Sequence, residues 1–129
     1  MQTILIDQFM VPEAAAREFL ENVHFSANIV KTRPGFVEGY VHQRVAEDGR
    51  MNVITTAVWA SESAMEEARR SVATEFATLG FKPPEIMQRL GVTMQRDISP
   101  RALLIQGRAA AYRAVEASGN RRALARLAS

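Results

Sequence analysis

The sequence predicts one α+β domain in which an antiparallel sheet carries helices on one of its faces. Strand-like and helix-like segments follow one another in the order β-α-β-β-α-β, which is the split-βαβ or ferredoxin-like pattern. Pro and Gly residues fall between the segments, where a helix or strand has to end. The length of 129 residues suits a single hydrophobic core and is short for two.

The first half of the pattern begins with a strand and a long helix. The β-branched and apolar run at residues 3–11, "TILIDQFMV", predicts the strand, and Pro12 marks its end. From residue 13 to about residue 32, apolar side chains recur at three- and four-residue steps, which is typical of an amphipathic helix. Pro34 disfavours a helical conformation at the preceding residue and Gly35 favours a turn, so we expect the helix to end there.

A hairpin of two strands is expected next. Residues 36–45 predict the second strand, Asp48-Gly49 is a strong hairpin signal, and residues 51–59 predict the third strand. The odd positions of the second strand are mostly apolar and suit burial in a dimer. That arrangement would turn Tyr40 and His42 toward the helices, whereas a register shifted by one residue would exchange the two faces.

The pattern closes with a helix, a short helical segment and a fourth strand. Ser61 has the position of an N-cap for a helix that continues to about Leu79 and ends at Gly80. Two consecutive prolines then separate a short helical segment from this helix. Residues 92–98, "VTMQRDI", predict a weaker fourth strand.

The chain divides into a domain at residues 1–99 and a C-terminal extension at residues 100–129. The extension is rich in Ala and Arg and is expected to be helical, and from Arg101 onward it holds six Arg and one acid, Glu116. One interpretation is an arm that binds phosphate or an acidic partner. The interpretation we favour is a solvated helix that packs on a partner subunit.

Both faces of the predicted third strand are substantially apolar. Asn52, Ile54, Thr56 and Val58 lie on one side, and Val53, Thr55, Ala57 and Trp59 lie on the other. Helices can cover one face of such a sheet. A second copy of the sheet is the simplest cover for the other face, so we expect a homodimer that associates through the sheet.

The composition excludes several classes of function. There is no Cys, which removes disulfides, thiolate catalysis and Cys-based zinc or iron–sulfur sites. The formal net charge is only +2, so the overall balance gives no support to nucleic-acid binding. The N-terminus lacks the positive region of a signal peptide, and no stretch approaches the ~18 apolar residues of a membrane span. We therefore expect a cytoplasmic protein without a membrane or nucleic-acid partner.

Three segments together resemble the antibiotic biosynthesis monooxygenase-like domain of the dimeric α+β barrel superfamily. They are "FMVPEAAAREFLENV", "RPGFVEGYVHQRV" and "NVITTAVWASESAMEEA". Each carries a feature of the family: an aromatic–x–Val–Pro turn, a helix that ends in Pro-Gly-Phe, and a strand that ends in Trp before an acidic helix start. The resemblance covers roughly residues 3 to 98.

The resemblance implies a barrel of two back-to-back sheets, with a pocket in each subunit between the sheet and the helices. Members of the family include oxygenases of quinols and aromatic phenols that use neither metal nor flavin, so we expect no cofactor. Other members bind and degrade haem through an axial His on the second helix. Arg69 stands about where that ligand would fall, and the segment contains no His, so haem degradation by this ligation is disfavoured.

Asp7, His24 and Trp59 are the candidate catalytic residues. Asp7 shares a face of the first strand with apolar neighbours, which makes it either a general base or a carboxylate at an exposed edge that pairs with an Arg. The family commonly has Asn near this position. His24 borders the sheet-facing stripe of the first helix and is either a base for a phenolic proton or a half-exposed residue. Trp59 matches the pocket Trp of the family and is otherwise a core residue.

Four further residues are expected to contact the substrate: Phe9, Tyr40, His42 and Arg69. For a metal, the chain offers two His, no Cys and no H-x-x-x-H spacing, so a conventional zinc site is disfavoured. The leading hypothesis is a cofactor-independent monooxygenase of a small phenol or quinol. The alternatives are a non-catalytic dimer that binds a small hydrophobic ligand, and a structural dimer whose Arg-rich extension recruits a partner.

Overall fold

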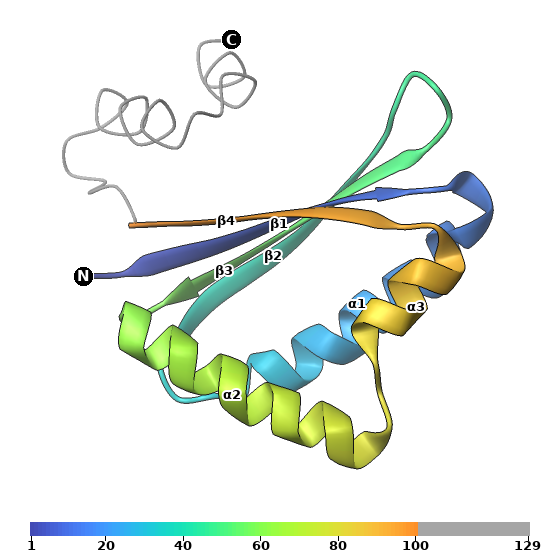
Figure 1. Ribbon diagram of the computed structural model, residues 1–129. Coiled ribbons are helices and arrows are strands. Elements are labelled where there is room, and N and C mark those ends of the chain that lie inside the picture. The colour runs from blue at the N-terminus through green and yellow to red at the C-terminus, as the bar shows by residue number, and fades with distance from the viewer. Residues whose placement is uncertain (101–129) are drawn as a thin grey trace, which may run out of the picture.

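The computed structural model describes residues 1–100, which form a four-stranded antiparallel sheet with all the helices on one face (Figure 1). The elements are β1 (Thr3–Val11), the 3-10 turn η1 (Glu13–Ala15), α1 (Ala16–Val30), β2 (Phe36–Val45), β3 (Met51–Trp59), α2 (Glu62–Leu79), α3 (Pro83–Leu90) and β4 (Thr93–Pro100). The strand order β2-β3-β1-β4 places β1 and β3 in the centre of the sheet. This is the predicted ferredoxin-like fold, and the expected helical extension lies outside the described residues.

Local signals set the ends of α2 as the sequence predicts. The Ser61 hydroxyl accepts a hydrogen bond from the backbone N–H of Ala64 at 3.0 Å, which satisfies one of the free donors at the start of a helix. At the other end Gly80 adopts the left-handed conformation, with φ of 68°, that commonly terminates a helix. The cap at Ser61 fixes the start of α2 at Glu62, three residues after Trp59, the last residue of β3.

The turn at Gly35 brings the end of α1 against the start of α2. Gly35 has φ of +87°, and a Cβ atom there would lie 2.6 Å from the Cβ of Ala64. Its carbonyl accepts a hydrogen bond from the N–H of Ala60 at 2.7 Å. Only glycine therefore fits this turn without displacing α2.

The space between the sheet and the helices is filled by two separate apolar clusters. The first cluster has as its buried members Phe9, Val11, Phe19, Val53 and Val92. The second, which we call the Trp59 cluster, has as its buried members Trp59, Met65 and Ala68, with Phe36 packed against them. An aromatic pair anchors each cluster: the ring centroids are 4.9 Å apart for Phe9 and Phe19, and 5.4 Å apart for Phe36 and Trp59.

A bulge near the start of β2 decides which of its side chains face the helices. Phe36 pairs with Trp59, but the next pair in register is Glu38 with Val58, so one extra residue lies between them. As a result Phe36 and Val41 both pack against the buried clusters. Tyr40 lies on the opposite face with its side chain 55% exposed.

The expectation that Tyr40 and His42 turn toward the helices is therefore wrong. The odd positions of β2 face the helices, and these two even positions share the open face with their partners Thr56 and Ile54 in β3. The physical reason is the bulge, because it lets the even-numbered Phe36 and the odd-numbered Val41 occupy the same face.

No helix among the described residues covers the other face of the sheet (Figure 1). This open face carries apolar side chains at its centre, namely Ile4 and Ile6 of β1 and Ile54 and Val58 of β3. Within residues 1–100 there is also no helix with the length and apolar character needed to cross a membrane.

Candidate functional site

A polar row crosses the helix-facing side of the sheet between the two apolar clusters. Arg96 of β4 lies directly opposite Asp7 of β1, and Asp7 lies directly opposite Thr55 of β3. Directly opposed residues in antiparallel strands share a face, so these three side chains lie in one line across three strands. Apolar residues flank the row on both sides, with Phe9 in the first cluster and Leu5 against the Trp59 cluster.

Asp7 and Arg96 form a bidentate ion pair in this row. The Nε of Arg96 donates to one carboxylate oxygen of Asp7 at 2.7 Å, and an Nη donates to the other at 2.8 Å. Asp7 is 8% exposed, whereas the Arg96 side chain is 37% exposed. The hydrogen bond to Asp7 raises the pKa of Arg96 above its usual value and outweighs the opposing effect of its burial, so the guanidinium remains charged.

The surroundings of Asp7 match one of its two interpretations only in part. The carboxylate is paired with an Arg, as one of them holds, but it lies on an internal strand and is buried rather than exposed at an edge. The carboxylate holds the guanidinium of Arg96 through two of its five N–H donors.

Trp59 supplies the second polar group that faces the same interior. Its side chain is 2% exposed in the Trp59 cluster, and its indole N–H is buried with no hydrogen-bond acceptor among residues 1–100. A buried donor left unpaired costs about 1–3 kcal/mol, so an acceptor that reached this N–H would be bound favourably. Along β3, Trp59 is four residues from Thr55, which corresponds to about 13 Å between their Cα atoms.

The helix-facing side of β4 leaves the polar row accessible. Met94 and Ile98 flank Arg96 two residues away on the same face, and they are 42% and 40% exposed. Because these three side chains are only partly covered, a ligand can approach the guanidinium from the β4 edge. Its apolar parts would then contact Met94 and Ile98.

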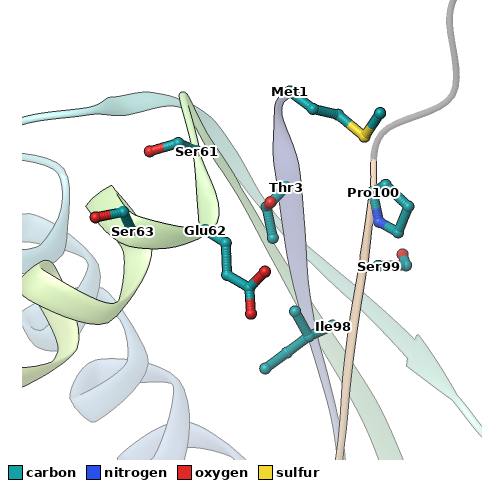
Figure 2. Close-up of a pocket in the computed structure, with 8 residues that line it drawn as sticks. All are labelled: Met1, Thr3, Ser61, Glu62, Ser63, Ile98, Ser99 and Pro100. Atoms are coloured by element: carbon teal, nitrogen blue, oxygen red, sulfur yellow. The ribbon is translucent and has the colours of Figure 1, made fainter.

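A cavity of about 610 Å³ lies beyond Ile98, between the start of α2 and the outer ends of β1 and β4 (Figure 2). Its lining comprises Met1, Thr3, Ser61, Glu62, Ser63, Ile98, Ser99 and Pro100. Figure 2 shows the Glu62 carboxylate extending from α2 into the same space as the Ile98 side chain. The hydroxyls come from three different elements, while Ile98 and Pro100 provide an apolar wall.

The remaining predicted site residues are not brought to the polar row. His24 lies exposed on α1 and does not pack against either cluster, and Arg69 lies exposed on α2, where it pairs with Glu66 at 3.0 Å. Phe9 faces the interior but is committed to the first cluster. Tyr40 and His42 lie together on the open face, with ring centroids 6.2 Å apart.

Two residues of the polar row, Arg96 and Thr55, were absent from the predicted site. The signal for Arg96 was present, because it interrupts an apolar alternation of Met94 and Ile98 just as Asp7 interrupts that of β1. The signal for Thr55 was weaker, since Thr is common in strands. Within residues 1–100 no group of three or more His, Asp or Glu side chains is arranged to hold a metal ion.

The comparisons with known proteins agree with this architecture. The model of the antibiotic biosynthesis monooxygenase family matches residues 3–77. A protein of Shewanella loihica PV-4 proposed to be a monooxygenase is 20% identical with a TM-score of 0.60, over 79% of this chain and 94% of that chain. A variant of SnoaB, a cofactor-independent oxygenase of Streptomyces nogalater, is 23% identical with a TM-score of 0.58, over 78% and 92%.

A dimeric ferredoxin-like protein from an uncultured marine organism is 14% identical with a TM-score of 0.58, over 79% of this chain and 96% of that chain. No curated protein is significantly similar in sequence. At these identities the structural similarities show the shared fold, and the family match covers more than half of the sequence. The chain belongs to the antibiotic biosynthesis monooxygenase family.

Proposed function

We propose that the protein is a cofactor-independent monooxygenase of a small phenol or quinol. The observation that carries the proposal is the pair of buried Asp7 with the partly exposed Arg96, whose guanidinium is held between two apolar clusters and beside the accessible Met94 and Ile98 side chains of β4. The family match and the likeness in fold to SnoaB support the same chemistry.

The proposed reaction balances without an added reductant. A phenol that loses its proton transfers one electron to O₂, and the resulting superoxide and phenoxyl radical combine at a ring carbon that bears hydrogen. The C–OOH group formed loses water, so one oxygen atom stays as a quinone carbonyl and the other leaves in the water. The substrate supplies all the electrons, so the protein has to orient it, exclude water and stabilise anions.

The described residues suit these three tasks. Arg96 would stabilise the phenolate and then the peroxide anion, because its guanidinium is charged and keeps donors free. Asp7 would act as a positioning residue that holds the guanidinium in place. The Trp59 N–H would donate to a second oxygen of the substrate. His24 is exposed on α1, so it would take the phenolic proton through intervening water molecules.

Oxygen uptake with a panel of hydroquinones and naphthols tests the proposal. Arg96→Gln is expected to lower kcat by about a hundredfold or more, the cost of one preorganised donor to a developing anion, and Trp59→Phe by about tenfold. Arg70→Gln is the matched control, because Arg70 is exposed on α2 and has no ion-pair partner among residues 1–100. His24→Ala tests the remaining candidate base.

Two results would count against this assignment. If oxygen uptake stays at the uncatalysed rate across the panel, the protein is not an oxygenase of these substrates. If uptake is catalysed but Arg96→Gln and Arg70→Gln behave alike, the polar row is not the site. With ¹⁸O₂, one labelled atom is expected in the quinone and one in water.

A second candidate function is a non-catalytic dimer that binds a small hydrophobic ligand. The observation that favours it is the packing of Phe19, Phe36 and Trp59, which fill part of the interior between sheet and helices. Quenching of Trp59 fluorescence by a quinone without any oxygen uptake would support this candidate. Because Trp59 is the single Trp of the chain, the signal reports this cluster alone.

We also propose that the subunits associate through the open face of the sheet. No helix among the described residues covers the partly exposed Ile4, Ile6 and Ile54 on this face (Figure 1), and association would remove them from water. The likeness in fold to a dimeric ferredoxin-like protein supports this arrangement. Tyr40 and His42 then belong to the subunit interface rather than to the substrate site.

A further inference from the structure

The cavity in Figure 2 contains a carboxylate that makes no ion pair within residues 1–100. Glu62 is the first residue of α2, and its exposed side chain extends toward β1 (Figure 2). The carboxylate of Glu18, by contrast, pairs with Arg89. Glu62 therefore offers the cavity an acceptor whose lone pairs are free.

A second polar group lines the same cavity from the side of the sheet. Thr3 of β1 is 7% exposed, and its hydroxyl makes no hydrogen bond with another residue from 1 to 100. A polar group buried to this extent normally has a partner, because burial of an unpaired one is unfavourable. The Thr3 hydroxyl can donate to a ligand, whereas the ionised Glu62 can only accept.

The rest of the cavity suits the apolar body of a small organic ligand. Ile98 is 40% exposed in the lining, and Pro100 lies on the same face of β4. The volume of about 610 Å³ falls within the range of about 300–1,000 Å³ that is typical of sites for small molecules. Since Ile98 also flanks Arg96, a ligand seated here can continue along β4 to the polar row.

The charges around the cavity favour a neutral ligand. Its lining contains no Arg, Lys or His side chain, and Glu62 would repel an anion. Glu62 also lies in the first turn of α2, where the positive end of the helix dipole favours the carboxylate and disfavours a cation beside it. A neutral group with an N–H for Glu62 and a carbonyl for Thr3 suits both, and a carboxamide carries these two side by side.

We infer that the cavity binds a carboxamide group. Its N–H donates to Glu62, its carbonyl accepts from the Thr3 hydroxyl, and the apolar part of the ligand lies against Ile98 and Pro100. The inference holds whether or not the protein is an oxygenase, because it concerns binding alone.

Titration of the full chain with benzamide tests the inference, beside three probes of similar size that each lack one of its features. Acetophenone has a methyl group in place of the amide nitrogen, benzoate has a second oxygen and a negative charge there, and benzylammonium has donors and a positive charge but no carbonyl. Backbone amide signals of Ser61, Ser63 and Ile98 in ¹H–¹⁵N spectra report binding at this cavity. We expect saturable shifts with benzamide, binding about fivefold weaker for acetophenone and benzylammonium, and none for benzoate.

Two variants and a control assign the contacts. Glu62→Gln removes the charge and introduces an NH₂ donor, so benzoate should gain binding while benzamide loses about threefold. Thr3→Val keeps the shape of the side chain and removes the hydroxyl, so benzamide should again bind about threefold more weakly. Glu67→Gln, exposed on the same helix and outside the lining, should change neither affinity.

The dispersion of the same spectra shows that each variant is folded. Any of four results would overturn the inference: no saturable shift with benzamide, equal affinities for benzamide and acetophenone, tighter binding of benzylammonium than of benzamide, or affinities in Glu62→Gln and Thr3→Val that match those of Glu67→Gln.

Discussion

The two faces of the sheet are formed by the same strands but differ in where they carry charged side chains. On the helix-facing side, β1 presents Asp7 among buried apolar residues, and Arg96 neutralises it. On the open side, β1 presents Ile4 and Ile6 with no charged residue between them and no helix above them. The covered face of β1 thus contains a charged residue, whereas its open face contains Ile4 and Ile6 at the centre of the sheet.

This contrast accords with the two proposals made for the faces. An ion pair with a buried carboxylate is weak evidence for stability, because a hydrophobic pair of similar volume often does as well. The Asp7–Arg96 pair therefore fits the proposed role in substrate binding better than a purely structural one. The open apolar side chains fit the proposed association of subunits.

The largest expected effect comes from removing the aromatic anchor of the helix-facing side. Trp59→Ala is expected to lower the free energy of unfolding by about 3–5 kcal/mol, because the side chain is 2% exposed and packs against Phe36. Chemical denaturation measures the loss. Trp59→Phe keeps most of the packing and should lose less than half as much, and equal losses in the two variants would show that packing is not the cause.

Breaking the ion pair should cost less than removing Trp59. Arg96→Met leaves the Asp7 carboxylate buried without its donors, at a cost of about 2 kcal/mol in the free energy of unfolding. Adding Asp7→Leu should recover most of that loss while leaving any oxygenase activity abolished. If the double variant is no more stable than the single one, the pair contributes through something other than its buried charge.

A charge on the open face should change association more than folding. Ile54→Asp is expected to cost about 1 kcal/mol within one subunit, since Ile54 is only partly buried. It should also convert a dimer to a monomer in analytical ultracentrifugation. Thr74→Asp, on the exposed surface of α2, is the control that should leave the mass unchanged. A wild-type monomer at high concentration would contradict the proposed interface.

The smallest effect concerns the attachment of α3 to α1. The hydrogen bond from Arg89 lowers the pKa of Glu18 below its ordinary value of 4.5, so the folded state favours the carboxylate. Stability from this group is present above about pH 4.5 and is lost as pH falls through the lowered value. Glu18→Gln should therefore flatten the dependence of Tm on pH below 4.5, and an unchanged slope would contradict the link.

The fold could be predicted from the sequence because its signals are local. The strands at residues 3–11, 36–45 and 51–59 and the caps at Ser61 and Gly80 lie where the residue types place them. The site was predicted only in part. Asp7 is a charged residue in an apolar strand and Trp59 is the single Trp, so the sequence singles out both. The pairing of Asp7 with Arg96 depends instead on the register between residues far apart in the chain.

The error in β2 has a different cause. The alternation of apolar and polar residues predicts a regular strand, and no residue type in "FVEGYV" indicates the extra residue. The one residue type related to the bulge is Gly39, because a Cβ atom there would lie 3.0 Å from the Phe36 ring. Sequence periodicity therefore gives the two sets of side chains in such a strand but not which set faces the core.

That bulge also lets the strand gain or lose one residue without changing what either face displays. Deleting Val37 would bring Phe36 and Glu38 into consecutive pairing with Trp59 and Val58, and the residues beyond would keep their present partners and faces. A one-residue insertion or deletion at this point is therefore neutral for both surfaces. Sequence alignments need a one-residue gap here to keep equivalent side chains on equivalent faces.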